Sequence, residues 1–256
     1  MVYSILYDAT KCVGCRGCQV ACKRWNELEA ETTKLRATFT NPPDLSSQTW
    51  LYMNFVEEKA ESPEDVRISW NFARRSCMHC VDPACASVCP TNAITKLSEG
   101  PVVIDQERCM GCKYCTQACP FDIPRFDEEK GVVFKCTMCA DRIGVDVHPA
   151  CVQSCVAGAL SFGDKETMLA QANVRAAKIN GILYGEKEAG GTDVIYILPR
   201  PAAELGLRQP PLESVGSYWR SLLTRISAIG VVGIAAFVLL GVIIRRRVLL
   251  MKEKEE

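Results

Sequence analysis

Cysteine is the feature of this sequence that most restricts how the chain can fold. The chain has 256 residues and 16 cysteines, and all 16 fall into four groups of four, which we call quartets one to four. They are Cys12, Cys15, Cys18 and Cys22; Cys77, Cys80, Cys85 and Cys89; Cys109, Cys112, Cys115 and Cys119; and Cys136, Cys139, Cys151 and Cys155. Disulfide scaffolds are usually shorter and denser in cysteine, so this pattern predicts a metal protein.

The spacing within each quartet is that of a bacterial ferredoxin run or a variant of it. Quartets one and three share the pattern C-x2-C-x2-C-x3-C, whereas quartets two and four have a longer interval between the second and third cysteines. In such runs three closely spaced thiolates bind one cubane, and the fourth cysteine binds the other cluster of a pair. Four thiolates per site therefore predict four [4Fe-4S] clusters.

The order of the quartets along the chain indicates how they share ligands. Quartets two and three are neighbours and both end in Cys-Pro, at Pro90 and Pro120, so we expect them to exchange their fourth cysteines. Quartets one and four then pair by elimination. The expected ligand sets are Cys12, Cys15, Cys18 with Cys155; Cys136, Cys139, Cys151 with Cys22; Cys77, Cys80, Cys85 with Cys119; and Cys109, Cys112, Cys115 with Cys89.

Two other uses of the cysteines remain as alternatives. Structural zinc also binds C-x2-C pairs, but the third and fourth cysteines of each quartet are surplus to that pattern. A disulfide network is compatible with the even number of cysteines, but it would require export from the cytosol. Residues 1–8 lack the basic and apolar regions of a signal peptide. We therefore expect the chain to begin in the reducing cytosol, where thiolates bind metal more often than they pair.

Charge gives a second expectation about the sites. The formal charge is balanced, with 30 Lys and Arg against 30 Asp and Glu, and indicates no nucleic-acid partner. Four thiolates around an oxidised cubane leave about −2 per site, so nearby basic side chains are candidates to offset it: Arg16, Lys23, Arg24, Arg74, Arg75, Arg108, Lys113, Lys135 and Arg142. Because the thiolate count is complete, we expect His79 and His148 to make backbone hydrogen bonds or pack loops.

An uncharged apolar run near the C-terminus predicts one membrane helix. Residues 226–244 are 19 residues long, which in a helix cover about 28 Å, close to the ~30 Å hydrocarbon core. Arg225 and Arg245–Arg247 bracket the run, and Tyr218 and Trp219 precede it as interfacial aromatics do. A buried core helix is the alternative.

Basic residues are more numerous after this run than before it. This distribution predicts that the C-terminal tail lies in the cytoplasm and the iron–sulfur domain on the outer, periplasmic face of the cell membrane. An outer domain without a signal peptide is consistent if the folded chain is exported attached to a partner that carries the signal.

The expected fold is α+β, with two double-cluster ferredoxin-like units, one inserted in the other. Unit A comprises residues 1–30 and 134–185, and unit B comprises residues 72–133. Residues 31–71 form an insertion, either a partner surface or ordinary packing; residues 186–219 form a partner-contacting segment and extended linker, 220–247 the transmembrane helix with its flanks, and 248–256 the tail. Strands are predicted at 2–7, 50–56, 102–105, 132–134, 159–162 and 194–198, short helices after Cys18, Pro83 and Pro149, and a longer helix from Asp164 to about Asn180.

Several stretches carry a likeness to a known family: GCQVACKRWNE (17–27), NPPDLSSQTW (41–50), CMHCVDPACASVCP (77–90), GCKYCTQACPFDIPR (111–125), KCTMCADR (135–142), PACVQSC (149–155) and GGTDVIYIL (190–198). With them the sequence resembles the four-cluster iron–sulfur subunits of membrane molybdopterin oxidoreductases, and in particular the beta subunits of respiratory formate dehydrogenases. One departure is Val156, which stands where that family usually has proline after the last cysteine.

The resemblance implies a non-catalytic electron-transfer subunit with two partners, and the chain itself has no phosphate-loop, dinucleotide-binding or nucleophile motif. One implied partner is a molybdopterin catalytic subunit that carries the export signal. The other is a membrane cytochrome b that passes electrons to quinone. The alternatives are the same electron relay serving a nickel–iron hydrogenase or a sulfur-compound reductase, and, more remotely, a membrane-tethered zinc or scaffold protein.

Overall fold

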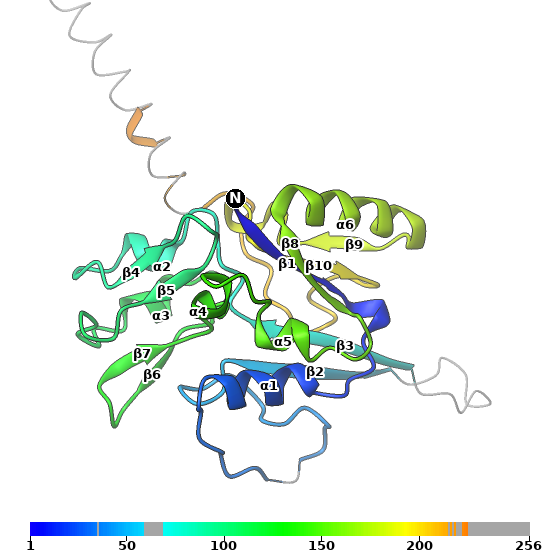
Figure 1. Cartoon of the computed structure of the whole chain (residues 1–256), viewed down its shortest axis with the longest axis horizontal. Coiled ribbons are helices and arrows are strands. Elements are labelled where there is room, and N and C mark those ends of the chain that lie inside the picture. Colours follow the sequence, from blue (N-terminus) through cyan, green and yellow to red (C-terminus); the bar gives the residue numbers. More distant parts are fainter. Residues whose placement is uncertain (35, 59–68, 215, 217, 219–221, 225–256) are drawn as a thin grey trace, which may run out of the picture. The chain divides into compact units, whose positions relative to one another are not determined.

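The computed structural model describes residues 1–34, 36–58, 69–214, 216, 218 and 222–224 (Figure 1). The chain divides into two compact units, residues 1–214 and residues 215–256, and the first contains every cysteine. The expected membrane helix at 226–244 and the basic residues after it lie outside the described residues. Within the described part of the chain, no helix has both the length and the apolar character needed to cross a bilayer.

A four-stranded sheet forms one side of the first unit. Its strands lie in the order β8 (Leu160–Asp164), β1 (Tyr3–Asp8), β10 (Val194–Leu198) and β9 (Ile182–Tyr184). β1 and β10 are parallel, and the two outer strands run antiparallel to their neighbours. The sheet therefore joins the N-terminal segment to a segment almost two hundred residues later in the sequence.

Helix α6 (Lys165–Ile179) covers one face of this sheet (Figure 1). The Asp164 side chain caps its first turn by accepting hydrogen bonds from two backbone N–H groups, and Asn180 ends it in a left-handed conformation. The buried helix face packs on one side chain of β1 and two of β10: Met168, Ala172 and Ala176 against Leu6, Ile195 and Ile197. The alternate side chains of both strands face the main core, so the apolar run at 194–198 is a strand buried on both faces.

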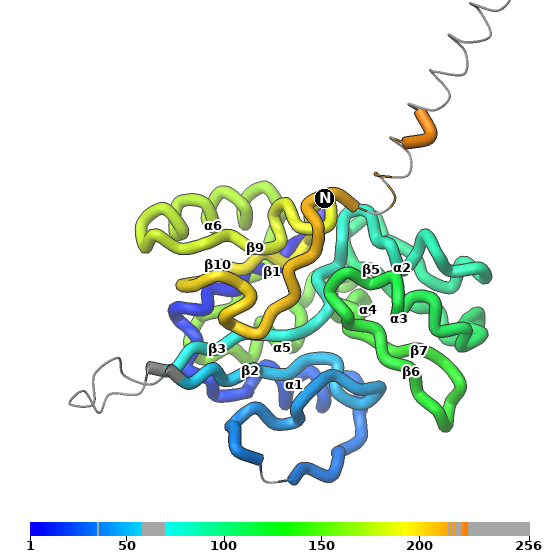
Figure 2. Tube along the Cα trace, turned by 180° about the vertical axis from the view of Figure 1, so that it is seen from behind, coloured from blue at the N-terminus to red at the C-terminus, as the bar shows by residue number. Residues whose placement is uncertain are grey.

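Three antiparallel hairpins complete the strands: β2 (Leu51–Glu58) with β3 (Ser69–Ser76), β4 (Ile94–Lys96) with β5 (Val102–Ile104), and β6 (Arg125–Asp127) with β7 (Val132–Phe134) (Figure 2). The β2–β3 hairpin belongs largely to the segment predicted as an insertion. Its residues Leu51 and Met53 are buried in the main core, so this part of the insertion is packed structure rather than only an exposed surface.

Short helices carry the third cysteine of each quartet. They are α1 (Gly17–Trp25), α2 (Ala84–Ser87), α3 (Tyr114–Ala118) and α5 (Ala150–Gln153), and further turns are η1 (Ala9–Lys11), α4 (Ala140–Ile143) and η2 (Glu188–Gly190). The helices predicted after Cys18, Pro83 and Pro149 are confirmed. Helix α1 packs on α5, and α2 packs on α3, so the third cysteines of quartets one and four lie on neighbouring helices, as do those of quartets two and three.

The proline-containing segment at 199–211 differs from the extended linker expected from the sequence. It turns at 202–206 and buries Ala202, Leu205 and Leu207 in the main core. The Tyr184 hydroxyl donates to the carbonyl oxygen of Arg208, which fixes the segment against β9. The prolines break regular structure here, but the apolar residues between them hold the chain against the domain.

Candidate iron–sulfur centres

The first two cysteines of every quartet lie on the same kind of backbone turn. The residue before the second cysteine has a positive φ in all four: 65° at Gly14, 48° at His79, 70° at Gly111 and 58° at Met138. Glycine takes this left-handed conformation without steric cost, and at Gly111 a Cβ atom would collide with the carbonyl oxygen of Gly131. In the turns of quartets two and four the left-handed residues are His79 and Met138, and their side chains are buried.

The thiols of quartets one and four lie close enough to influence one another electrostatically. Burial raises the pKa of Cys18 to about 12; Arg74 lowers it, and the thiolates of Cys151, Cys12 and Cys155 raise it. Burial also raises the pKa of Cys12, and among its neighbours Cys155 raises it further. The structure thus brings the last cysteine of quartet four to the first cysteines of quartet one.

The fourth cysteine of quartet one has the opposite surroundings. Burial raises the pKa of Cys22 well above its ordinary value, and the thiolates of Cys136, Cys151 and Cys139 raise it further. These four cysteines line one pocket, together with Ile5, Trp50, Leu51, Arg74, Met138 and other residues. They are the four cysteines that the sequence predicts to share a cluster.

Quartets two and three exchange neighbours in the same way. Burial raises the pKa of Cys119 to about 12, and Cys77 and Cys85 contribute to the increase. Burial also raises the pKa of Cys80, with further increases from the thiolates of Cys77, Cys119 and Cys85. The last cysteine of quartet three therefore lies among the first three of quartet two.

The remaining four thiols line a second pocket, whose walls include Cys89, Cys109, Cys112 and Cys115. The pKa of Cys89 is lowered: burial opposes this, but hydrogen bonds from the Thr91 side chain and from backbone N–H groups outweigh it. Burial raises the pKa of Cys115 to about 11, and the thiolates of Cys109 and Cys112 add to that. These four cysteines again form one of the predicted ligand sets, and the ligand assignment stays a prediction.

The donor chemistry of these groups fits iron–sulfur clusters. Buried thiols that sit together ionise reluctantly because their charges repel in a desolvated setting, and iron supplies the positive charge that offsets them. Among the residues that the structure describes, no three His, Cys, Asp or Glu side chains converge on a position for a single metal ion. In a cubane each thiolate binds its own iron, so the four ligands are spread over a cluster instead of meeting at one ion.

Both histidines have the structural roles expected of them. The Nδ1 atom of His79 accepts a hydrogen bond of 2.9 Å from the backbone N–H of Val102. Burial, followed by the charges of Lys135 and Lys96, lowers the pKa of His79 well below its ordinary value and keeps the ring neutral. The ring of His148 packs 5.4 Å from that of Phe162.

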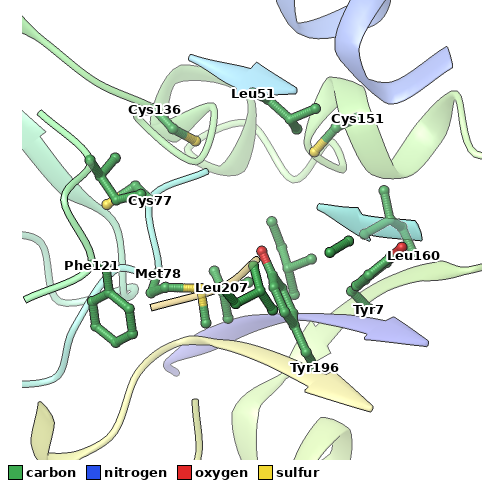
Figure 3. Packing of buried hydrophobic residues seen from close by; sticks show 14 of the residues in the cluster. Tyr7, Leu51, Cys77, Met78, Phe121, Cys136, Cys151, Leu160, Tyr196 and Leu207 are labelled. Atoms are coloured by element: carbon green, nitrogen blue, oxygen red, sulfur yellow. The ribbon is translucent and has the colours of Figure 1, made fainter. Parts of the chain in front are cut away.

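Two buried tyrosines near the thiols were not singled out from the sequence. Tyr7 donates a hydrogen bond of 2.9 Å to the carbonyl oxygen of Phe72, and its hydroxyl lies near the Cys12 thiol. Tyr196 extends from β10 toward the side of the core that holds Cys136 and Cys151 (Figure 3). The sequence signal that could have identified them is their position. Each tyrosine lies on the core-facing side of a predicted strand, where it alternates with aliphatic residues.

Comparison with known proteins agrees with this chemistry. A family model described as a 4Fe-4S dicluster domain matches residues 68–165, and another with the same description matches residues 11–93. With its 16 cysteines, the chain therefore carries two dicluster domains and four [4Fe-4S] clusters.

Similar proteins have been described in several bacteria. The chain is 38% identical over 236 residues to the iron–sulfur subunit of the nitrate-inducible formate dehydrogenase of Escherichia coli (strain K12), covering 88% of this chain and 79% of the relative. It is 36% identical over 242 residues to the formate dehydrogenase iron–sulfur subunit of Haemophilus influenzae, covering 90% and 76%. The hydrogenase-2 operon protein HybA of Escherichia coli O157:H7 is 33% identical over 255 residues, covering 85% and 75%.

Proposed function

Because this chain belongs to the family of formate dehydrogenase iron–sulfur subunits, we propose that it relays electrons from a molybdenum- or tungsten-containing subunit that oxidises formate to a membrane cytochrome b and quinone. The chain is an electron-transfer subunit, and catalysis takes place in another subunit. The observation that carries the proposal is the division of 16 thiols into four neighbouring groups within one folded unit. The ligand sets are those predicted from the sequence.

The groups have a natural order within the relay. Cys15 and Cys112 are exposed, and each belongs to a different group of four, which we call the outer sites: Cys12, Cys15, Cys18, Cys155 and Cys89, Cys109, Cys112, Cys115. The other two groups, which we call the inner sites, are Cys22, Cys136, Cys139, Cys151 and Cys77, Cys80, Cys85, Cys119. Cys119 is the only inner cysteine that is partly exposed; the others are buried.

Electrostatic neighbours connect the four sites in one line. Cys18 of an outer site lies near Cys151 of an inner one. The pKa of Cys136 is raised to about 12 by burial, lowered by Arg74, and raised again by the Cys77 thiolate of the second inner site. Cys85 of that site in turn lies near Cys115 of the other outer site. We therefore propose that electrons enter at one outer site, pass through both inner sites and leave at the other.

Each outer site has exposed apolar side chains around it. Near one site they are Val13, Val20 and Val156, and near the other they are Val88, Met110 and Tyr114. Val156, in place of the proline usual in the family, is 85% exposed beside Cys155. Exposed apolar side chains beside a redox centre suit a protein partner that excludes water from the path of the electron.

We further propose that residues 226–244 anchor the chain in the cell membrane, with the iron–sulfur domain on the periplasmic face and the tail in the cytoplasm. The support is the uncharged run and the excess of basic residues after it. Protease treatment of spheroplasts and inverted vesicles tests this orientation. Digestion of the domain in spheroplasts is the expected result, and its protection there contradicts the proposal.

The HybA relative supports a second candidate, the same relay serving a hydrogenase. The full-length chain is therefore purified anaerobically from its own host with its associated subunits, and formate or hydrogen is added separately. The expected result is about sixteen irons per chain and bleaching of the visible cluster absorbance by formate. Bleaching by hydrogen but not formate favours the hydrogenase, and a colourless zinc-containing chain excludes both.

A further inference from the structure

Arg74 on β3 is a completely buried cation. Its side chain is the largest of the fully buried ones, with 1% of the residue exposed. Among the residues that the structure describes, no Asp or Glu lies within ion-pair distance of it, and its Nε atom makes no hydrogen bond. Removing an unpaired charge from water is strongly unfavourable, so some other negative charge must compensate it.

The groups around the guanidinium are thiols and a tyrosine. Nη1 donates to the Tyr196 hydroxyl at 3.3 Å, and Nη2 donates to the Cys151 sulfur at 3.8 Å. Arg74 also lines the same pocket as Cys22, Cys136 and Cys151. Its charge acts on Cys18 of the neighbouring outer site as well. The guanidinium thus lies near thiols of both predicted clusters of unit A.

We propose that Arg74 is the fixed counter-charge of the cluster held by Cys22, Cys136, Cys139 and Cys151, and that it raises the reduction potential of this cluster and, to a smaller extent, of the cluster at Cys12, Cys15, Cys18 and Cys155. The inference rests on the proposed ligand sets. It assigns to one basic residue a role that the sequence suggested only for a set of nine.

The direction of the effect follows from charge. When a cubane accepts one electron from its neighbour in the relay, its net charge with four thiolates changes from about −2 to about −3. A buried cation stabilises the more negative state more strongly, because there is little solvent to screen it. Arginine stays protonated throughout, so no proton accompanies the electron and the group acts as a positioning charge rather than a proton donor.

Tyr196 holds the guanidinium in place. The tyrosine is fully buried, and its ring lies 5.1 Å from that of Tyr7 in an edge-on arrangement. Because its hydroxyl accepts the bond from Nη1, the second terminal nitrogen of Arg74 is directed at Cys151. Removing this hydroxyl leaves the charge in the protein but frees its orientation.

The neighbouring residue Arg75 provides a matched control. It lies on the same strand, but its guanidinium pairs with the Asp122 carboxylate at 3.3 Å and also reaches the carbonyl oxygen of that residue. Its charge is therefore already compensated by a carboxylate, and the inference gives it no part in either unit A cluster.

The test is a redox titration of the anaerobic complex, followed by electron paramagnetic resonance, on wild type and on Arg74→Gln, Arg74→Lys and Arg75→Gln. At an ambient potential near the midpoint of the affected cluster, Arg74→Gln is expected to lower the ratio of reduced to oxidised cluster about tenfold, a shift of about 59 mV for a one-electron couple. In Arg74→Gln the midpoint potentials of one or two of the four clusters shift, and those of the others do not change. Arg74→Lys retains most of the wild-type ratio of reduced to oxidised cluster, and Arg75→Gln leaves all four midpoint potentials unchanged.

The iron content separates this inference from the proposed function. Four clusters with unchanged potentials in Arg74→Gln overturn the role of Arg74 and leave the relay intact, and so does an equal shift of all four steps. If Arg74→Gln assembles fewer clusters, the titration is carried out on Tyr196→Phe instead. A smaller downward shift in the midpoint potential of the same cluster is then expected. An unchanged titration of Tyr196→Phe then overturns the inference. A wild-type chain without cubane signals overturns the proposed function itself.

Discussion

The outer and inner cluster sites use the same backbone turn in different surroundings. In the outer sites the left-handed position is Gly14 or Gly111, and the next cysteine along the chain, Cys15 or Cys112, is exposed. In the inner sites the same position holds His79 or Met138, both completely buried. The turn itself is a local requirement of the ligand spacing, whereas the residue placed on it depends on whether solvent or the protein core lies beyond.

The cations of the two kinds of site differ in the same way. Beside the outer sites Arg16 lies over the ring of Phe55 at 4.6 Å and Lys113 over that of Phe126 at 3.8 Å. Beside the inner sites the corresponding charges are buried: Arg74 contacts Cys151, and Lys135 donates to the backbone carbonyl oxygens of Val102 and Cys136. Water and salt screen the outer charges, so the inner charges have the stronger influence on their clusters.

The largest expected difference is between losing an inner and an outer ligand. Cys136 belongs to the main core, whereas Cys15 is exposed. We expect Cys136→Ser to abolish accumulation of folded chain, because an empty inner site leaves buried thiols and Arg74 uncompensated in the core. Cys15→Ser is expected to lose one cluster at most, about four irons of sixteen. Anaerobic yield and iron analysis of both variants measure the contrast.

Equal losses of iron and of folded chain in the two serine variants would contradict the distinction between inner and outer sites. A wild-type preparation made in parallel controls for incomplete cluster insertion, since its iron content sets the reference for both variants.

A smaller difference is expected from the same substitution at two methionines. Met138 is 1% exposed on the turn of an inner site, and Met110 is 64% exposed on the turn of an outer one. Met138→Ala should destabilise the chain by about 2–4 kcal/mol through the cavity it leaves, whereas Met110→Ala should change stability by less than about 0.5 kcal/mol. Anaerobic urea titration, followed by the loss of cluster absorbance, compares them. Similar urea midpoints would show that the inner turn is not held by core packing.

Much of the fold was predictable because its signals are local. The helix at α6 was predicted from the Asp164 cap and its apolar face, and the strand at β10 from a continuous apolar run. The four clusters were predicted because ligand spacing within a ferredoxin run is also local. Each of these features needs only a short window of sequence.

The remaining features depend on contacts between distant segments. The hydrogen bond between Arg74 and Tyr196 joins positions 122 residues apart, and the cation is buried beside the core that contains residues of both the β2–β3 hairpin and β10. The sequence placed Arg74 beside a quartet but carried no signal that separated it from exposed basic residues such as Lys113. The segment at 199–211 differs from an extended linker for a similar reason, since its prolines are visible in the sequence but the core that receives Leu205 is not.

The smallest expected effect is at Lys113, an outer cation. Its ammonium lies over Phe126 and forms an ion pair of 3.2 Å with Glu128, and both charged side chains are exposed. Lys113→Gln should cost about 0.5–1 kcal/mol of stability. It should shift the potential of its outer cluster less than Arg74→Gln shifts the inner one, and added salt should remove the shift because the charge is solvated. The matched control is Lys130→Gln, which also removes a lysine that lies over an aromatic ring. The ammonium of Lys130 lies 5.4 Å from the Phe134 ring. A salt-independent shift at Lys113 as large as that at Arg74 would mean that burial does not govern how strongly a cation acts on these clusters.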